Sequence, residues 1–233
     1  MKRHIPNALT SANLLCGMIG IIYVLMGEIN YGAYFILLAA LFDFLDGFVA
    51  RILKVSGELG KQLDSLADLV TFGVLPSFVL FKMVESNTDI WYLPFLVLIV
   101  AVFSAVRLAK FNIDERQSDR FIGVPTPANA LLISTLPFLS DRILLFEEFL
   151  GNPYLLIGLA FLMSYLLVAE LPLIALKFKD YSFTNNIFRY FVIGSSLIFL
   201  ILLGIAGIPF AIISYIALSI AEAWITKNAE KLS

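Results

Sequence analysis

The chain has 233 residues, of which 60% are hydrophobic, and its mean hydropathy of +0.92 excludes the soluble globular class. Its formal net charge of −2 gives no reason to expect a nucleic-acid partner. The single cysteine, Cys16, excludes an intrachain disulfide and a cysteine-based metal site. The composition therefore indicates a polytopic membrane protein.

Apolar segments long enough to cross a membrane follow one another along the chain, and no soluble domain or internal repeat separates them. They predict an all-α, polytopic membrane protein with about eight transmembrane helices in a single domain over residues 1–233. We expect the helices at residues 8–27, 31–53, 62–84, 90–112, 124–146, 152–176, 186–204 and 207–227.

Lysine and arginine are distributed unequally between the two ends of these segments. With eight spans, 14 of the 16 fall on one side, and only Lys82 and Arg142 fall on the other. Positively charged residues accumulate on the cytoplasmic side of membrane proteins. We therefore expect a multi-pass protein of the cell (plasma) membrane with both termini in the cytoplasm.

The first segment begins with polar residues. Asn7, Thr10 and Asn13 are spaced three residues apart, so they share one helix face, and Pro6 suits the start of the helix. Helix capping and hydrogen bonds between helices are sufficient to explain these side chains.

Four aspartates lie at the end of the second segment and the start of the third. Asp43 and Asp46 are three residues apart, and Asp64 and Asp68 are four apart, so each pair shares a helix face. The chain is expected to turn between Val55 and Gly60, which makes the two helices antiparallel. The sequence therefore predicts a cluster of four carboxylates near the cytoplasmic side.

Small residues lie beside the first carboxylate pair. At about 100° per residue, Gly47 and Ala50 fall within about 60° of Asp43, and Arg51 lies at the edge of the same strip. A glycine and an alanine in this strip leave room for a bulky, flat ligand to approach the backbone.

Four carboxylates in an apolar protein require compensation. Each charge costs about 2.5–3.5 kcal/mol at the centre of a membrane helix, so four would cost roughly 10 kcal/mol if they faced lipid. One or two divalent cations remove this cost, and oxygen ligands without His or Cys favour Mg²⁺ or Mn²⁺. Mg²⁺ bound by carboxylates commonly completes its coordination shell with a substrate phosphate. The pattern thus predicts a site for a metal and a phosphate.

A second polar stretch, RLAKFNIDERQSDRFIGVPTPANA, links the fourth segment to the fifth. Arg107, Lys110 and Arg120 are candidates to bind a lipid phosphate or a substrate carboxylate, and Asn112 lies among them. The alternative is that these are ordinary positive charges at the cytoplasmic surface. Further along, Glu170 is predicted inside the sixth spanning helix, where it would need a partner or would meet backbone groups freed by Pro172.

The full aspartate pattern is Asp-x2-Asp-Gly-x2-Ala-Arg-x8-Gly-x3-Asp-x3-Asp, and it runs from Asp43 through Gly60 to Asp68. It resembles the signature of the CDP-alcohol phosphatidyltransferases at every fixed position. The later run RLAKFN, followed by FIGVPTPA, is similar to the phosphatidylserine synthase branch of that family. The resemblance covers roughly residues 5–130, which we expect to be the catalytic half.

The resemblance implies transfer of a phosphatidyl group from CDP-diacylglycerol, or an archaeal ether-lipid equivalent, to L-serine, with phosphatidylserine and CMP as products. Mg²⁺ or Mn²⁺ would be the cofactor, and a homodimer is implied. The metal ligands would be the four aspartates, with Asp68 also the general base. Residues expected near the nucleotide and its diphosphate are Asn7, Thr10, Asn13, Gly47, Ala50, Arg51 and Gly60, and those expected near the acceptor are Arg107, Lys110, Asn112 and Arg120.

Two alternatives remain open from the sequence. The same chemistry would operate with another acceptor, such as glycerol 3-phosphate or inositol phosphate. A divalent-cation transporter would use the aspartates as its ion site, although no chain of acidic residues continues outward through the third segment.

Overall fold

Two long helices form an N-terminal hairpin. They are α1 (His4–Leu25) and α2 (Ile29–Leu53), and they pack against each other in the computed structural model. Gly27 has a φ of +98° in the turn between them, a conformation that glycine adopts at little cost. Lys54 takes the left-handed conformation, with a φ of 52°, and ends α2.

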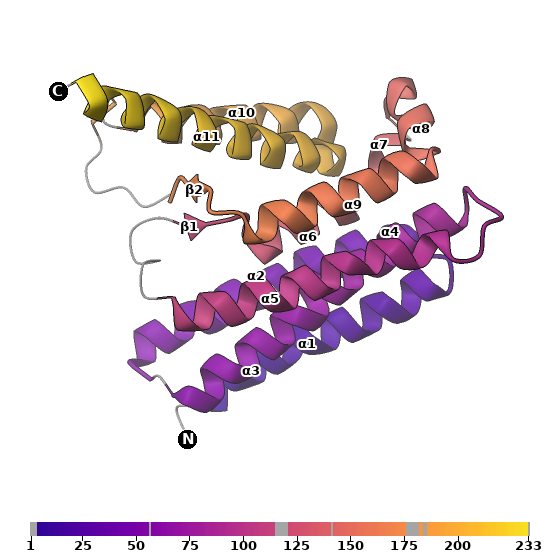
Figure 1. Cartoon of the computed structure of the whole chain (residues 1–233). Coiled ribbons are helices and arrows are strands. Elements are labelled where there is room, and N and C mark those ends of the chain that lie inside the picture. The colour runs from indigo at the N-terminus through magenta and orange to yellow at the C-terminus, as the bar shows by residue number, and fades with distance from the viewer. Residues whose placement is uncertain are drawn as a thin grey trace.

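The structure describes residues 4–55, 57–114, 121–140, 142–175, 182–183 and 186–232. Helices occupy all eight predicted segments. In Figure 1 the helices of the N-terminal half run in a similar direction, and the last two, in yellow, lie above them at an angle. The elements after α2 are α3 (Glu58–Asp68), η1 (Leu69–Val74), α4 (Leu75–Glu85), η2 (Leu93–Leu98), α5 (Ile99–Ile113), β1 (Phe121–Ile122), α6 (Thr126–Ser134), α7 (Pro137–Ser140), α8 (Leu144–Leu150), α9 (Pro153–Val168), β2 (Pro172–Leu173), α10 (Ile187–Leu203), η4 (Gly204–Gly207) and α11 (Ile208–Leu232).

The membrane-spanning character of these helices is clear from their length and apolar composition. Among the residues that the structure describes, four helical stretches qualify as spans: His4–Leu25, Glu58–Glu85, Leu93–Ile113 and Ile187–Thr226, the last of which contains both α10 and α11. Pro153–Val168 is a shorter apolar helix. The prediction of an all-α, polytopic membrane protein is confirmed.

The fifth predicted helix is interrupted. The expectation of one continuous helix over 124–146 is wrong, because the segment divides into α6, α7 and α8. Pro137, the first residue of α7, has no backbone N–H and disfavours a helical conformation in the residue before it. The chain therefore bends between α6 and α7.

The sixth predicted helix is shorter than expected. α9 begins at Pro153, where the Asn152 side chain accepts hydrogen bonds from Tyr154 N (3.0 Å) and Leu155 N (3.3 Å), and it ends at Val168. The residues after it leave the helix and pair with β1, so β1 and β2 form a short antiparallel ladder. The placement of Glu170 inside a spanning helix is therefore wrong, and its side chain is exposed.

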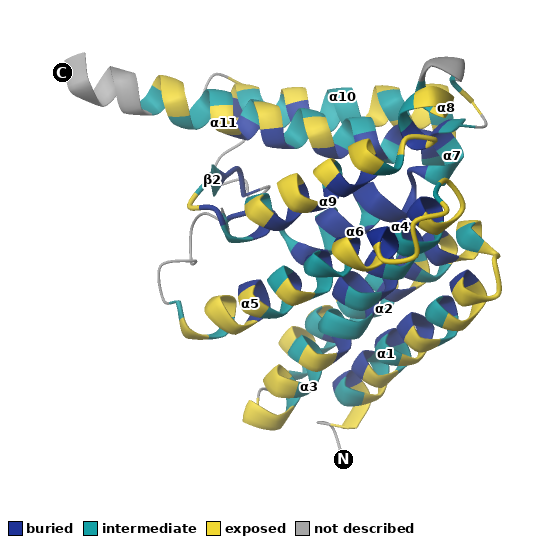
Figure 2. Cartoon of the chain, turned by 45° about the vertical axis from the view of Figure 1, so that its right-hand side comes forward, coloured by how far each residue is buried: buried dark blue, intermediate teal, exposed yellow. Residues whose placement is uncertain are grey.

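One end of the bundle gathers most of the connections that the charge distribution assigns to the cytoplasm. α2 ends, α3 begins, α5 ends and α11 ends at the left of Figure 1, beside β1 and β2. In Figure 2, α4 and α6 are largely buried at the centre, whereas the outer faces of α1 and α11 carry many exposed residues. α4 is thus the central helix of the core, with Leu75, Val79 and Leu80 fully buried.

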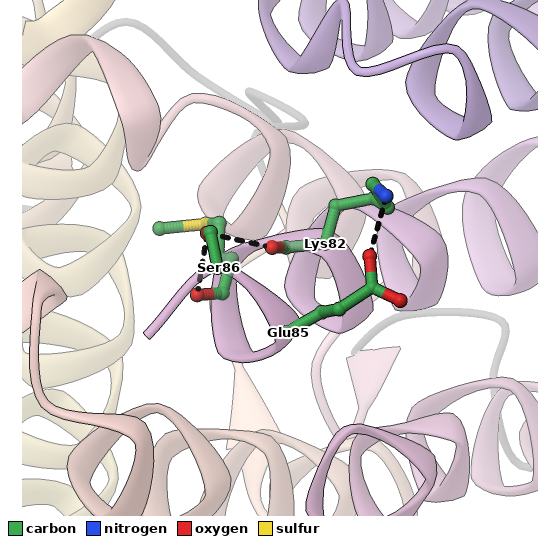
Figure 3. A network of polar contacts seen from close by, with 4 residues as sticks. Lys82, Glu85 and Ser86 are labelled. Carbon is green, nitrogen blue, oxygen red and sulfur yellow. Dashed lines mark hydrogen bonds and ion pairs between the residues drawn. The ribbon is translucent and has the colours of Figure 1, made fainter. Parts of the chain in front are cut away.

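Side chains at the C-terminal end of α4 contact one another and the last turn of the helix. Lys82 and Glu85 form an ion pair one turn apart, and the Ser86 hydroxyl donates to the Lys82 carbonyl at 2.8 Å (Figure 3). Ser86 also lies 3.2 Å from the Met83 carbonyl. The Lys82 carbonyl also accepts from the Ser86 backbone N–H at 3.0 Å, and the Asn87 side-chain amide donates to the Met83 carbonyl at 2.7 Å, so carbonyls in the last turn of the helix have partners.

Candidate active site

Two glycines of α1 allow this helix to pack directly against η1 and α4. A Cβ at Gly17 would lie 2.9 Å from Thr71 Cα, and one at Gly20 would lie 2.7 Å from a Leu75 methyl group. A side chain at either position would push the helices apart. This close approach brings the polar face of α1 beside the aspartates of α2 and α3.

Three of the four predicted carboxylates meet at one point. Asp43, Asp64 and Asp68 each offer an oxygen atom, and these atoms lie within 4.8 Å of one another. Asp64 Oδ1 is buried without a hydrogen-bond partner. The prediction that the two aspartate pairs face each other is confirmed for these three residues.

Asp46 lies beside these three residues and has a hydrogen-bond partner of its own. Its carboxylate accepts a hydrogen bond from the Thr10 hydroxyl at 2.6 Å, and its side chain is buried. It interacts electrostatically with Asp43, Asp64 and Asp68. Thr10 therefore fixes the orientation of one carboxylate from α1.

Asn13 performs a similar task for Asp68. Its amide nitrogen donates to Asp68 Oδ1 at 3.2 Å, and its backbone carbonyl accepts from the Thr71 hydroxyl at 3.1 Å. Asn13 is fully buried, and its Oδ1 has no hydrogen-bond partner. The polar face of α1 thus contacts the carboxylates, as interhelical hydrogen bonding predicts.

A π-helical segment, η1, begins immediately after Asp68. Residues Leu69–Val74 form this wider helical segment. Within it, Gly73 allows α5 to approach closely, because a Cβ at position 73 would lie 2.9 Å from Ser104 Cβ of α5. Insertions of this kind frequently occur at functional sites. The helix predicted over residues 62–84 gave no indication of this π-helical segment.

A cavity of about 900 Å³ opens beside the carboxylates, between the ends of α1, α2 and α3. Its lining includes both polar and small residues, among them Asn7, Thr10, Asp46, Gly47, Ala50, Gly60 and Asp64. The cavity is large enough for a nucleotide. The expected strip of small residues on α2 therefore does face open space.

Arg51 and Asn13 differ from the predicted lining of this cavity. Arg51 is exposed, and its guanidinium nitrogens lie 3.9 and 4.0 Å from the position of a Cβ at Gly47. Asn13 lies deeper, against Asp68, and does not line the cavity. The turn is also shorter than expected, because α3 begins at Glu58 and already includes Gly60.

A buried cation lies near Asp68. Arg107 of α5 is only 7% exposed and interacts electrostatically with Asp68, and its guanidinium carbon lies 5.7 Å from the centroid of the Phe111 ring. Within the described part of the chain it forms no direct ion pair, and its Nε has no hydrogen-bond partner. A buried guanidinium without hydrogen bonds is costly, so this geometry favours an anionic ligand.

The chain can be compared with known proteins on this basis. A family model described as CDP-alcohol phosphatidyltransferase matches residues 3–176. The chain belongs to the CDP-alcohol phosphatidyltransferase family.

Curated relatives within the family carry one name. The chain is 35% identical over 159 residues to the CDP-diacylglycerol–serine O-phosphatidyltransferase of Bacillus subtilis, covering 66% of this chain and 87% of the relative. It is 32% identical over 197 residues to the protein of the same name from Helicobacter pylori strain J99, covering 83% and 81%. A Saccharomyces cerevisiae protein of that name is 34% identical over 162 residues, covering 62% and 57%.

CDP-alcohol phosphatidyltransferases generally use divalent metals, and the donor set here fits one. Three carboxylate oxygens within 4.8 Å of one another supply the hard ligands that Mg²⁺ and Mn²⁺ prefer. The buried Asp64 Oδ1 lacks a partner that a cation would provide. Asp43, Asp64 and Asp68 are therefore the residues able to hold a metal together, with Asp46 beside them.

The other residues expected to bind the acceptor in this family member have different surroundings. Lys110 is exposed at the end of α5. Asn112 links α5 to α3, because its amide donates to Ser65 Oγ at 2.8 Å and its carbonyl accepts from Lys61 Nζ at 2.9 Å. Arg120 lies outside the described residues. Of the candidates that the structure describes, Arg107 is the one that interacts electrostatically with an aspartate of the site.

Proposed function

We propose that this chain is a CDP-diacylglycerol–serine O-phosphatidyltransferase, which forms phosphatidylserine and CMP. One juxtaposition carries the proposal: the cavity of about 900 Å³ is lined by Asp46 and Asp64, while the buried Arg107, which does not line the cavity, interacts electrostatically with Asp68 of the same cluster. The cavity suits the nucleotide of the lipid substrate, and the guanidinium suits an acceptor with a carboxylate. The names of the curated relatives support the same reaction.

The cavity residues define the proposed nucleotide side of the site. Gly47, Ala50 and Gly60 leave space for the cytidine, while Asn7 and Thr10 offer polar atoms at the base of the cavity. Arg51 would contact a phosphate or the ribose from the rim. Asn13 acts through Asp68, whose carboxylate it orients.

Asp68 is the proposed general base. The hydroxyl oxygen of serine forms a bond to the phosphatidyl phosphorus as the bond from that phosphorus to the oxygen of CMP breaks, and the hydroxyl proton passes to Asp68. Asn13 holds one oxygen of this carboxylate at 3.2 Å, which leaves the other oxygen for the proton. Arg107 would hold the serine carboxylate, with Lys110, Asn112 and Arg120 contributing at the outer end of α5.

The metal belongs to the same proposal. Mg²⁺ or Mn²⁺ held by Asp43, Asp46, Asp64 and Asp68 would neutralise the diphosphate and stabilise the departing CMP. The Thr10 hydrogen bond of 2.6 Å keeps Asp46 turned toward the cavity that the diphosphate would enter.

The orientation and assembly are also proposed. The positive-inside distribution of Lys and Arg supports a cytoplasmic site and cytoplasmic termini, and the membrane is taken as the plasma membrane. The catalytic half is taken as residues 5–130, within a single domain of 1–233, and the enzyme is taken as a homodimer. Lipid packing around exposed side chains such as Phe44 and Ile201 suits a multi-pass protein.

Release of CMP by purified protein in detergent tests the function. The protein is given CDP-diacylglycerol or an ether-lipid equivalent, Mn²⁺ or Mg²⁺, and either L-serine, glycerol 3-phosphate, inositol phosphate or no acceptor. CMP release that depends on L-serine, and that is lost in Asp68→Asn, is the expected result. Release with a phosphorylated acceptor instead of serine would overturn the assigned acceptor, and no release with any acceptor would overturn the transfer chemistry.

A further inference from the structure

The cavity beside the aspartates is lined by more acidic than basic side chains. Asp46, Glu58 and Asp64 all line it, whereas Lys61 is the only lysine or arginine among its described lining residues. The diphosphate of a nucleotide would carry further negative charge into this space. Lys61 is therefore the lining residue whose charge suits a phosphate.

Lys61 shares a helix face with one of the residues able to hold a metal. It lies three residues before Asp64 in α3, a spacing that places two side chains next to each other on a helix. Both residues line the cavity together with Gly57 and Gly60, which have no side chain to separate a ligand from α3. A phosphate bound near Asp64 would thus be within reach of the long lysine side chain one turn earlier.

The ammonium group of Lys61 is held by the end of another helix. Its Nζ donates to the Asn112 carbonyl at 2.9 Å. Asn112 lies in the last turn of α5, where carbonyls have no partner within the helix and where the helix dipole favours a positive charge. The contact therefore stabilises the end of α5 and at the same time fixes the direction of the lysine side chain.

A second contact joins the same two helices. The Asn112 side-chain amide donates to Ser65 Oγ at 2.8 Å, and the Ser65 hydroxyl donates to the Lys61 carbonyl at 3.2 Å. Next to Asn112 in α5, the ring of Phe111 lies 5.7 Å from the guanidinium carbon of Arg107. The part of α5 that holds Lys61 is thus the part that carries the proposed acceptor-binding cation.

The bond to Asn112 does not use the full binding capacity of the lysine. An ammonium group has three N–H donors, and the Asn112 carbonyl accepts from one of them. The side chain can therefore donate to a phosphate oxygen without releasing α5. Because Lys61 is otherwise exposed, this bond also reduces the side-chain entropy that would be lost when a ligand binds.

We propose that Lys61 binds a phosphate oxygen of the nucleotide diphosphate while its hydrogen bond to Asn112 keeps it directed to the cavity. The inference rests on the proposed transfer from a CDP-lipid. Lys61 forms no covalent bond and takes no proton from the acceptor. Through it, the bound nucleotide is connected to α5, the helix that carries Arg107.

Equilibrium binding of CDP and of cytidine to the purified protein in detergent, at saturating Mn²⁺, tests the proposal. Both ligands contain the nucleoside, and only CDP carries the diphosphate. In Lys61→Met the Kd for CDP is expected to rise about 10- to 100-fold, because a hydrogen bond between charged groups is lost, with the Kd for cytidine unchanged. Lys61→Arg keeps the charge and should retain most of the affinity for CDP.

Two controls separate the cation from its surroundings. Lys54→Met removes a lysine at the end of α2 that does not line the cavity, and it should keep the wild-type affinity for CDP. Ser65→Ala breaks the Asn112 side-chain contact between α3 and α5 but leaves the cation in place. It should keep the wild-type preference for CDP over cytidine.

The preference for CDP over cytidine remains informative if a variant folds poorly, because loss of folded protein affects both ligands equally. An unchanged Kd for CDP in Lys61→Met would overturn the proposal, as would an equal loss of CDP and cytidine binding. A loss of preference in Ser65→Ala as large as in Lys61→Met would also contradict it, since helix packing would then be responsible. Absence of CMP release by a wild type that binds CDP would instead refute the proposed function.

Discussion

The aspartate cluster should be a source of instability when no cation is bound, and Asp43→Asn tests this directly. The carboxylate oxygens of Asp43, Asp64 and Asp68 lie within 4.8 Å of one another. At an effective dielectric constant of about 20, two unit charges at this distance repel by about 3.5 kcal/mol. Removing one charge therefore stabilises the metal-free fold, while it abolishes the proposed activity.

Thermal unfolding in detergent with a chelator measures the effect. For a chain of this size, 1 kcal/mol corresponds to about 2–4 °C in Tm, so a rise of at least about 3 °C is expected in metal-free Asp43→Asn. Added Mn²⁺ should raise the Tm of the wild type more than that of the variant, because a ligand stabilises the state that binds it. CMP release should be lost in the variant at every metal concentration.

Asp89→Asn is the matched control. It removes one negative charge from an exposed loop at the opposite end of the bundle, and it should leave Tm, the response to Mn²⁺ and CMP release unchanged. A metal-free Asp43→Asn protein that is less stable than the wild type would refute the reasoning. The three carboxylates would then be stabilised by their surroundings, and a cation would not be required.

Three further substitutions test the packing around the cluster. Thr10→Val removes the 2.6 Å hydrogen bond to Asp46 and should weaken the apparent Mn²⁺ affinity in CMP release by about 10- to 100-fold. Gly47→Leu should raise the KM for CDP-diacylglycerol at nearly unchanged Tm, because the nearest atom to its Cβ lies 3.9 Å away and the side chain would extend into the cavity. Gly17→Ala should lower Tm, because its Cβ would lie 2.9 Å from Thr71 Cα, and overpacking of this kind costs about 1–3 kcal/mol.

Controls for these substitutions come from the same helices or from open positions. Ser11→Ala removes an exposed hydroxyl that bonds only to the Asn7 carbonyl, at 2.8 Å, and should leave Mn²⁺ affinity unchanged. Gly158→Leu adds the same side chain as Gly47→Leu at a position with no atom within 4 Å, and should leave the KM unchanged. Equal effects in a variant and its control would show that the cavity or the hydrogen bond is not responsible.

The helical spacing of the aspartates was sufficient to predict that the two pairs converge. Residues three or four apart share a helix face, and an antiparallel turn brings two such faces together. The small residues Gly47 and Ala50 likewise predicted open space beside α2, because a helix face of glycine and alanine has no large side chain to fill it. Both inferences depend only on local geometry, and both agree with the structure.

Features that depend on packing between distant segments could not be predicted in this way. The break before Pro137 has a local cause, but the apolar residues around it suggested a continuous helix. The π-helical segment after Asp68 contains Gly73, which lies close to α5, and no spacing within the third predicted helix reveals this contact. The hydrogen bond from the Thr71 hydroxyl to the Asn13 carbonyl joins residues 58 positions apart, and nothing within either helix marks them as neighbours.

The contacts from α1 suggest how packing and metal binding depend on each other. Thr10 and Asn13 donate hydrogen bonds to Asp46 and Asp68, while Asp64 Oδ1 is buried without a partner. Side chains of α1 thus orient the carboxylates of Asp46 and Asp68, and Asp64 Oδ1 is left for a bound ligand to contact. A cation at the cluster would satisfy that oxygen and draw α2 and α3 together around α1. Metal binding should therefore strengthen the packing of α1, and the glycines that admit α1 should in turn raise the affinity for the metal.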